Sequence, residues 1–194
     1  PLAICQNRLE MLMEDETLSE QQMGEIAKTC QTLEYVSKLN KSLLLLSKID
    51  NSQFASVEKV CLNEILYRYL DDYQEVYDYK GITLDVHEKN TFNITMNGTL
   101  AVVLITNLLK NAFVHNIYKG KIQIEITSSN IRFGNTGKDE HLDEKHIFER
   151  FYQGSKKEGS TGLGLAIVDA ICRQSQLSIQ YQFVKGWHWF DISC

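Results

Sequence analysis

A glycine-rich segment near the C-terminal end, GSTGLGLAIVDAIC from Gly159 to Cys172, leads directly into an apolar stretch with helical spacing. Free backbone N–H groups and the positive end of the helix dipole make such a helix start a place where phosphate binds. The dinucleotide pattern GxGxxG fails here, and the nucleotide loop GxxxxGK[ST] is absent. The glycines therefore indicate either a backbone that approaches a phosphate group or simply a tight turn.

A second segment, NLLKNAFVHN, places polar side chains along one side of an otherwise apolar helix. Asn107 and Asn111 are four residues apart and share a face, and His115 continues the stripe one turn later. Asparagine is a mediocre helix former, whereas its carboxamide oxygen suits Mg²⁺ that also binds nucleotide phosphates. The stripe indicates a metal–nucleotide site or, alternatively, a solvated face opposite a buried one.

A third segment, IRFGNTGKDEHLD, puts an asparagine and a glycine at the end of a predicted strand. The amide of Asn135 can recognise an adenine edge, and Gly137 would let the backbone approach the base. The same residues also form an everyday turn, so this segment alone does not distinguish a base-binding site from a turn.

The elements that position these residues begin with a predicted helical hairpin. Apolar residues recur at helical spacing over 2–13, a polar turn follows at 14–17, and Thr17 or Ser19 is placed to cap a long helix over 19–48. The long helix carries a nearly heptad pattern, formed by Ile26, Cys30, Leu33, Val36, Leu39, Leu43 and Leu46. Because two helices bury too little core, we expect a second copy to complete a dimeric four-helix bundle. The alternative is that the hairpin packs on the domain that follows.

After a linker predicted at 50–53, helices and strands alternate. Helices are expected at 62–79, 100–115 and 163–173, and strands at 57–60, 82–86, 92–95, 121–127, 131–133, 177–183 and 187–192. This mixture predicts an α+β fold, in the form of an α/β sandwich with one sheet and helices packed on one of its faces.

The composition is that of a soluble globular protein, with 194 residues, 43% hydrophobic content and a net charge of -5. The negative charge argues against nucleic acid as a partner. Five cysteines without a CxxC pair predict reduced thiols rather than disulfides or a zinc site. The chain shows no apolar run long enough for a membrane span and opens on Pro1 instead of Met. We therefore expect a piece of a longer protein whose membrane contact lies in other parts.

Taken in their order along the chain, these segments and IFERFYQ at 147–153 resemble the N, G1, F and G2 boxes of the sensor histidine kinases, which share an ATPase superfamily with gyrase, Hsp90 and MutL. IFERFYQ corresponds to the F box and GSTGLGLAIV to the G2 box. PLAICQNRLEML is similar to the residues after the phosphoacceptor histidine in the family's His-Glu-x-x-Thr-Pro-Leu-Ala motif, and KLNKSLLLLSKIDNSQF to its second dimerisation helix. The resemblance covers essentially the whole chain. It implies a dimerisation hairpin at 1–50, truncated at its N-terminus, and an ATP-binding catalytic domain at 54–194.

The resemblance also implies roles for single residues. Asn111 would coordinate Mg²⁺ on the ATP phosphates, with Asn107 helping, and both are assigned as catalytic and metal-binding residues. His115 would lie near the phosphates or the ribose. Residues 154–161 would form a lid over ATP. The remaining nucleotide contacts implied are Asn135 to the adenine amino group, Gly137 beside the ring, Arg150 at the γ-phosphate, and Thr161, Gly162, Leu163 and Gly164 at the phosphates.

The sequence departs from the family's pattern in three places. The phosphoacceptor histidine is not in this chain and is expected a few residues before Pro1. Asn135 stands where aspartate is usual, which implies weaker ATP binding. Gln153 stands where arginine is frequent, which leaves the γ-phosphate to Arg150, Lys156 or Lys157.

The function implied is that of a protein histidine kinase. It would transfer the γ-phosphoryl group of ATP to a histidine on the dimerisation helix, and from there to the receiver domain of a response regulator. The alternative is a degenerate, non-catalytic nucleotide-binding or dimerisation module, which Asn135 and Gln153 favour. The long hairpin and short lid disfavour an ATP-driven clamp of the gyrase or MutL kind. The resemblance places the chain in the cytoplasmic portion of a membrane-anchored bacterial sensor.

Overall fold

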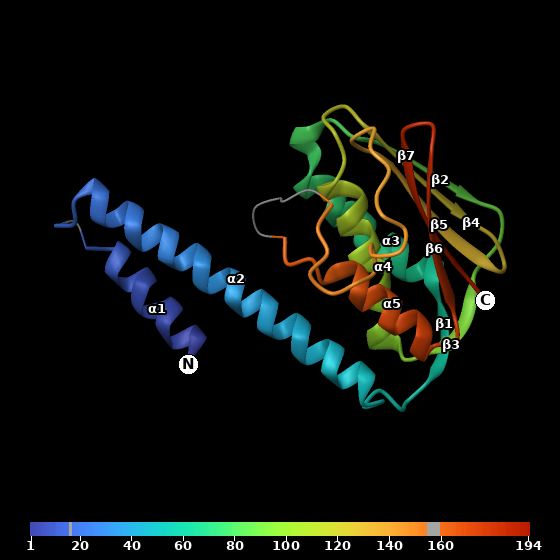
Figure 1. Cartoon of the computed structure of the whole chain (residues 1–194), viewed down its shortest axis with the longest axis horizontal. Coiled ribbons are helices and arrows are strands. Elements are labelled where there is room, and N and C mark those ends of the chain that lie inside the picture. The colour runs from blue at the N-terminus through green and yellow to red at the C-terminus, as the bar shows by residue number, and fades with distance from the viewer. Residues whose placement is uncertain (16, 155–159) are drawn as a thin grey trace.

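A long helical hairpin extends from a two-layer domain in the computed structural model, which describes residues 1–15, 17–154 and 160–194 (Figure 1). Helices α1 (Leu2–Met13) and α2 (Glu20–Asp50) form the hairpin. Ser19 begins α2 with a capping box, in which its Oγ accepts from the Gln22 N–H and its own N–H donates to the Gln22 Oε1 at 2.9 Å. The predicted hairpin is therefore confirmed, with α2 ending at Asp50 rather than at 48.

The elements of the domain follow in the order β1 (Glu58–Cys61), α3 (Leu62–Val76), the 3₁₀ turn η1 (Asp78–Lys80), β2 (Thr83–Glu88), β3 (Asn93–Met96), α4 (Gly98–Val114), β4 (Lys121–Ile126), β5 (Asn130–Thr136), α5 (Gly164–Gln174), β6 (Ser178–Val184) and β7 (Trp187–Ser193). This is the predicted α+β fold. The prediction of one sheet is wrong: β2-β4-β5-β7-β6 form the main sheet, and β1 and β3 pair separately as an antiparallel ribbon. Alternation of side chains identifies strands but does not say which strands pair.

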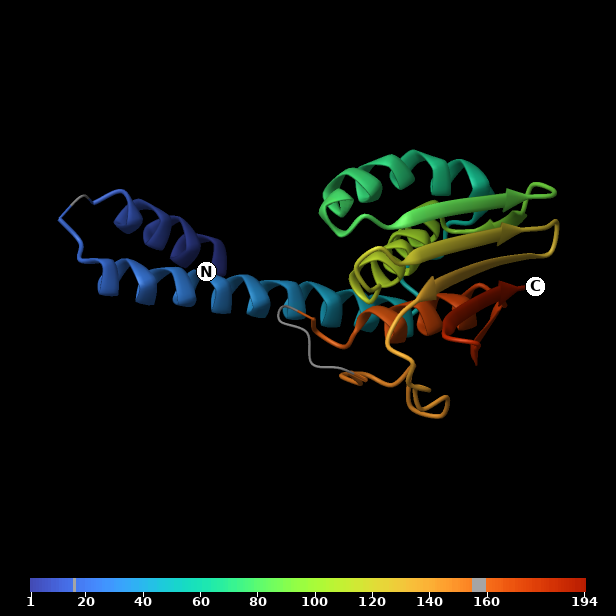
Figure 2. The same ribbon diagram turned by 90° about the horizontal axis from the view of Figure 1, so that it is seen from above.

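Helices α3, α4 and α5 cover one face of the main sheet (Figure 2). The side chains that point from the sheet toward the helices are buried and apolar, among them Ile122, Ile124, Ile131, Phe133 and Ile192. Strands β2 and β4 run parallel, and the other pairs are antiparallel. The alternation within β5 therefore sends Asn135 toward the helix side, together with Ile131 and Phe133.

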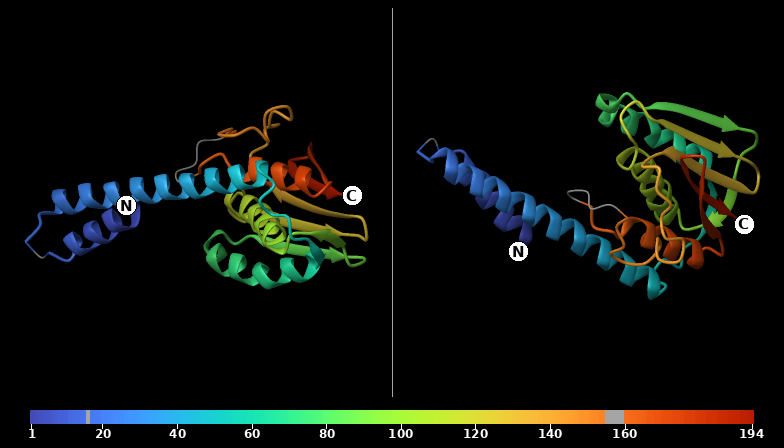
Figure 3. Two further views of the ribbon diagram at one scale, coloured as in Figure 1. Left: turned by 90° about the horizontal axis from the view of Figure 1, so that it is seen from below. Right: turned by 45° about the horizontal axis from the view of Figure 1, so that its top comes forward.

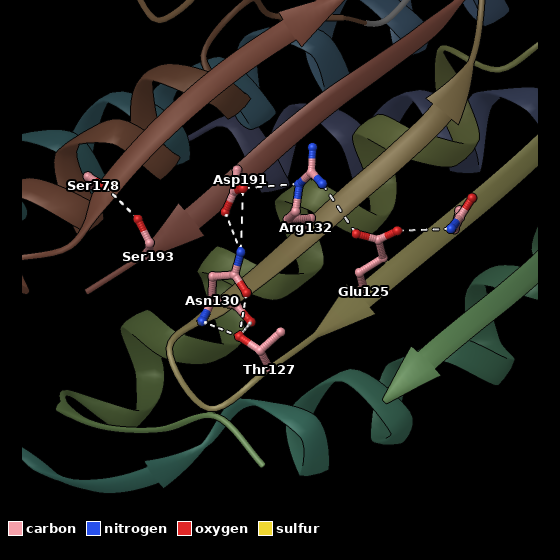
Figure 4. A network of polar contacts seen from close by, with 8 residues as sticks. Glu125, Thr127, Asn130, Arg132, Ser178, Asp191 and Ser193 are labelled. Atoms are coloured by element: carbon pink, nitrogen blue, oxygen red, sulfur yellow. Dashed lines mark hydrogen bonds and ion pairs between the residues drawn. The ribbon is translucent and has the colours of Figure 1, made fainter. Parts of the chain in front are cut away.

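The opposite face of the sheet carries a polar network (Figure 4). Arg132 lies between two carboxylates, with its Nη1 3.3 Å from Glu125 Oε2 and its Nε 3.0 Å from Asp191 Oδ2. Its guanidinium also stacks 4.7 Å from the ring centroid of Trp189. Partial burial raises the pKa of Asp191, although Asn130 and Arg132 oppose that shift. This network ties β4, β5 and β7 together on the solvent side.

The C-terminal half of α2 packs along α5 (Figure 3), with Leu46 and Ile49 buried in the core of the domain. The rest of the hairpin is open, and Ile4, Met11 and Leu12 are 61%, 70% and 50% exposed. The alternative interpretation, in which the hairpin packs on the domain, is therefore confirmed for the end of α2, and the dimeric four-helix bundle stays a prediction.

Candidate functional site

Helix α4 presents its asparagine stripe toward the start of α5. Asn97 caps α4, since its Oδ1 accepts from the Leu100 N–H at 3.2 Å. Asn107 donates from Nδ2 to the carbonyl of Val103 at 2.8 Å, which leaves its Oδ1 directed at α5. A Cβ added to Gly164 would lie 3.2 Å from that oxygen. The first residue of α5 therefore sits against the amide of Asn107.

The turn before α5 is tight, and it also leaves backbone N–H groups available for a phosphate. Gly162 has a φ of +66°, and a Cβ there would lie 2.7 Å from the carbonyl carbon of Phe151. Leu163 buries its side chain completely and provides no side-chain cap for α5. The turn is thus tight, and its geometry leaves the first N–H groups of α5 without a side-chain cap, as phosphate binding at a helix start requires.

At the other side of the site, Asn135, the residue before the last in β5, is only 2% exposed and lies opposite His188 of β7. The His188 Nε2–H donates to the carbonyl of Lys138 at 2.9 Å, which makes Nδ1 the acceptor for the Tyr181 hydroxyl at 2.8 Å. That hydroxyl accepts in turn from the Leu142 N–H at 3.4 Å. These contacts hold the loop after β5 against the β6–β7 hairpin.

Sequence reasoning missed His188, although the pattern WHWFDIS contained a signal. Alternation along β7 places His188 on the same inward face as Phe190 and Ile192, where a polar side chain needs a partner. Gly137 lies behind this ring, because a Cβ there would be 2.8 Å from His188 Cδ2. A larger residue at 137 would therefore displace the histidine.

A cavity of about 870 Å³ joins these parts. The predicted residues that line it are Asn107, Asn111, His115, Asn135, Thr161, Gly162 and Gly164. Leu163 lies beside the cavity with its side chain in the core. Arg150 lines a different hollow, between α2 and α5, where its Nη2 lies 2.6 Å from Asp50 Oδ2. Lys156, Lys157 and most of the expected lid, which spans 154–161, fall outside the described residues.

Lys80 and an aromatic wall close the cavity at the end of α4. The Lys80 ammonium donates to the carbonyls of Phe113 at 2.8 Å and Val114 at 3.0 Å, as a cation at a helix C-terminus commonly does. Burial lowers the pKa of Lys80. The ring of Tyr77 stacks 5.5 Å from that of Phe113. At the mouth of the cavity, Gln153 donates from Nε2 to the carbonyl of Ser160 at 2.7 Å.

The donor set fits a magnesium nucleotide. The cavity volume is within the range of small-molecule sites. Within the described parts of the chain, no three His, Cys, Asp or Glu residues gather where they could hold a metal ion. Mg²⁺ would take amide oxygens of α4 together with phosphate oxygens, which suits its preference for few protein ligands. Because residue 164 is a glycine, no side chain occupies the space directly beside the Asn107 amide oxygen.

The domain after the hairpin has the fold of the ATPase module of sensor histidine kinases. In it, a helix that carries asparagines faces a glycine-rich helix start. Residues 96–187 match the family described as "Histidine kinase-, DNA gyrase B-, and HSP90-like ATPase", so this stretch of the chain is an ATPase domain of that family. The heme sensor protein HssS of Staphylococcus epidermidis is 34% identical over 141 residues, which cover 70% of this chain and 31% of that protein. The chain thus spans about a third of the length of such relatives.

Solved structures show the same fold. Acinetobacter baumannii histidine kinase AdeS superposes with a TM-score of 0.68 at 22% identity, covering 99% of this chain and 93% of that one. Full-length ShkA in complex with AMPPNP also has a TM-score of 0.68, at 18% identity, covering 99% of this chain and 45% of that one. Among the described helices, none is long and apolar enough to cross a membrane.

Proposed function

We propose that this chain is the ATP-binding catalytic portion of a sensor histidine kinase. It transfers the γ-phosphoryl group of ATP to a histidine on the dimerisation hairpin, and a receiver domain of a response regulator takes the group from there. The observation that carries the proposal is the single cavity shared by the asparagine stripe of α4, Asn135 and the uncapped start of α5.

Different residues of the cavity bind different parts of the magnesium nucleotide. Asn111 and Asn107 offer amide oxygens to Mg²⁺, which neutralises phosphate charge when it is bound. Asn135 meets the adenine edge from its buried strand end. The backbone N–H groups at the start of α5 hold the phosphates, with Thr161 and Gly162 beside them and His115 across the cavity. Positioning and charge neutralisation are the main requirements of phosphoryl transfer.

The hairpin forms the homodimer in this proposal. The apolar side chains of Ile4, Met11 and Leu12 are exposed rather than packed on the ATPase domain, and a second copy would bury them. The hairpin is assigned to residues 1–50 and the catalytic domain to 54–194. As in other sensor kinases, the membrane anchor would belong to further parts of the protein and leave this portion in the cytoplasm.

Calorimetric titration with ADP and Mg²⁺ tests the site. The wild-type chain should bind, and Asn111→Ala should lower the affinity at least tenfold, or about 1.4 kcal/mol. Asn93→Ala, at an exposed position on β3, is the matched control and should bind normally. A wild-type chain that releases no heat with either ADP or AMPPNP would sink the proposal.

The non-catalytic alternative has two observations in its favour. Asn135 and Gln153 stand where the family pattern has charged residues, and the Gln153 amide is engaged with the carbonyl of Ser160. Incubation of the full-length protein with labelled ATP separates the two functions. A kinase yields an acid-labile, base-stable phosphoprotein, whereas a nucleotide-sensing module binds ATP and remains unlabelled.

A further inference from the structure

Helix α2 contributes three side chains to the nucleotide cavity. Lys38, Lys41 and Ser42 line it together with residues of the ATPase domain. Ser42 and Lys38 precede Leu46 by four and eight residues, so they lie on the same side of α2 as this buried leucine. Because Leu46 and Ile49 anchor that side in the domain core, Ser42 and Lys38 face the domain one and two turns before Leu46, toward the N-terminus of α2.

Lys38 and Lys41 lie at the end of the cavity whose wall is formed by α5. Helix α2 packs along α5 (Figure 3), whereas Asn135 and His188 belong to strands of the sheet behind. The start of α5 is the wall that would hold phosphates, and Lys38 and Lys41 therefore approach the phosphate end rather than the base end.

The cavity is strongly cationic. Among the described residues that line it, five are lysines and one, Glu140, is acidic. Lys80 already donates to two carbonyls at the end of α4. Lys38 and Lys41 are exposed on α2, where their long side chains can follow a polyphosphate.

We propose that Lys38 and Lys41 of the dimerisation helix bind the terminal phosphates of the nucleotide, so that the nucleotide bridges α2 and the ATPase domain. The proposal rests on the function proposed above and adds a regulatory consequence to it. By linkage, a nucleotide that binds better when α2 is docked also strengthens that docking by the same factor. A triphosphate extends farther and carries more charge than a diphosphate, so it should gain more from the two lysines.

The test compares nucleotide affinity in the whole chain, at low and moderate salt. Lys38→Ala/Lys41→Ala should weaken AMPPNP·Mg²⁺ binding roughly five- to tenfold, in line with two exposed charge contacts, and should weaken ADP·Mg²⁺ binding less. The loss should shrink as salt screens the charges. Lys38→Arg/Lys41→Arg should restore most of the affinity. Lys48→Ala removes the same charge from a residue of α2 that does not line the cavity, and is the control.

Two outcomes separate this inference from the proposed function. If the wild type binds both nucleotides, Asn111→Ala weakens binding, and Lys38→Ala/Lys41→Ala binds AMPPNP like the wild type, the inference is overturned and the function stands. An equal loss for Lys48→Ala would also overturn it, because net charge alone would then explain the effect. If the wild type binds neither nucleotide, the proposed function itself fails.

Discussion

The Arg150 guanidinium lies 2.6 Å from the Asp50 carboxylate, joining the loop before the cavity to the last residue of α2. The side chains of both residues are about half exposed, at 51% and 46%. In this arrangement α2 is fastened to the ATPase domain by its buried leucine and isoleucine and by this ion pair. Arg150 therefore serves the contact between the two parts, and its predicted role at the γ-phosphate requires that it first leave Asp50.

A double-mutant cycle of Asp50→Asn and Arg150→Ala should show a small coupling, below about 1 kcal/mol of unfolding free energy, because both groups are solvated. Denaturant unfolding at two salt concentrations measures it, and the coupling should fall at high salt. The same variants test Arg150 at the nucleotide. If released Arg150 reaches the γ-phosphate, Asp50→Asn should raise the affinity for AMPPNP and leave that for ADP unchanged.

His188→Phe should weaken nucleotide binding about three- to tenfold and destabilise the domain by about 1–2 kcal/mol, because the Tyr181 hydroxyl and the Lys138 carbonyl lose their partner. Tyr181→Phe should have a smaller effect of the same sign, since it leaves the bond to Lys138 in place. Titration calorimetry and urea unfolding measure the two effects. Gln182→Ala, exposed on β6, is the control, and normal affinity in His188→Phe would show that the loop after β5 does not need this anchor.

The pair of Asp143 and His146 predicts a local pH dependence. The hydrogen bond with Asp143 raises the pKa of His146 above its ordinary 6.5, and the same bond lowers the pKa of Asp143 below 3.8. The stabilising contact is therefore present between these two shifted pKa values. It is lost as the pH rises through the pKa of His146 and as the pH falls through that of Asp143. NMR titration should give a raised pKa for His146, and Asp143→Asn should lower it; an identical titration curve in the variant would contradict the contact.

Gly24→Ala should stabilise the chain by about 0.5–1 kcal/mol, because glycine is a poor residue within a helix and a Cβ at this position meets no atom within 4 Å. Thermal unfolding at one protein concentration measures the change. A loss of stability would instead reveal that another copy packs closely against residue 24, and concentration dependence of the unfolding midpoint would then confirm it.

Cys172 should resist thiol reagents in the native state. It is 1% exposed in α5, and burial raises the pKa of its thiol to about 12, so the reactive thiolate is scarce. Cys5 and Cys194 are exposed and should react first. Mass spectrometry over time, with and without nucleotide, measures the rates; rapid labelling of Cys172 in the native chain would show that α5 opens locally.

Periodicity predicted nearly every helix and strand within a few residues, because burial of one face imposes a period of 3.6 or 2 on the sequence. It did not predict that β1 and β3 leave the main sheet, since pairing depends on contacts far apart along the chain. The asparagine stripe and the glycines could be found from side-chain chemistry alone. Arg150 could not be placed that way, because its partner Asp50 is a hundred residues away and the choice between an acidic side chain and a phosphate is made by tertiary packing.

The side chains on the outward face of the sheet also determine what the tryptophan fluorescence of this protein can measure. Both tryptophans of the chain, Trp187 and Trp189, stack there at 5.6 Å between ring centroids, with Arg132 over one of them. Asn135 and the cavity lie across the sheet, behind a layer of aliphatic side chains. Tryptophan emission will therefore follow the integrity of the β5–β7 ladder and stay nearly silent when a ligand enters, so occupancy has to be followed with a fluorescent nucleotide or by heat.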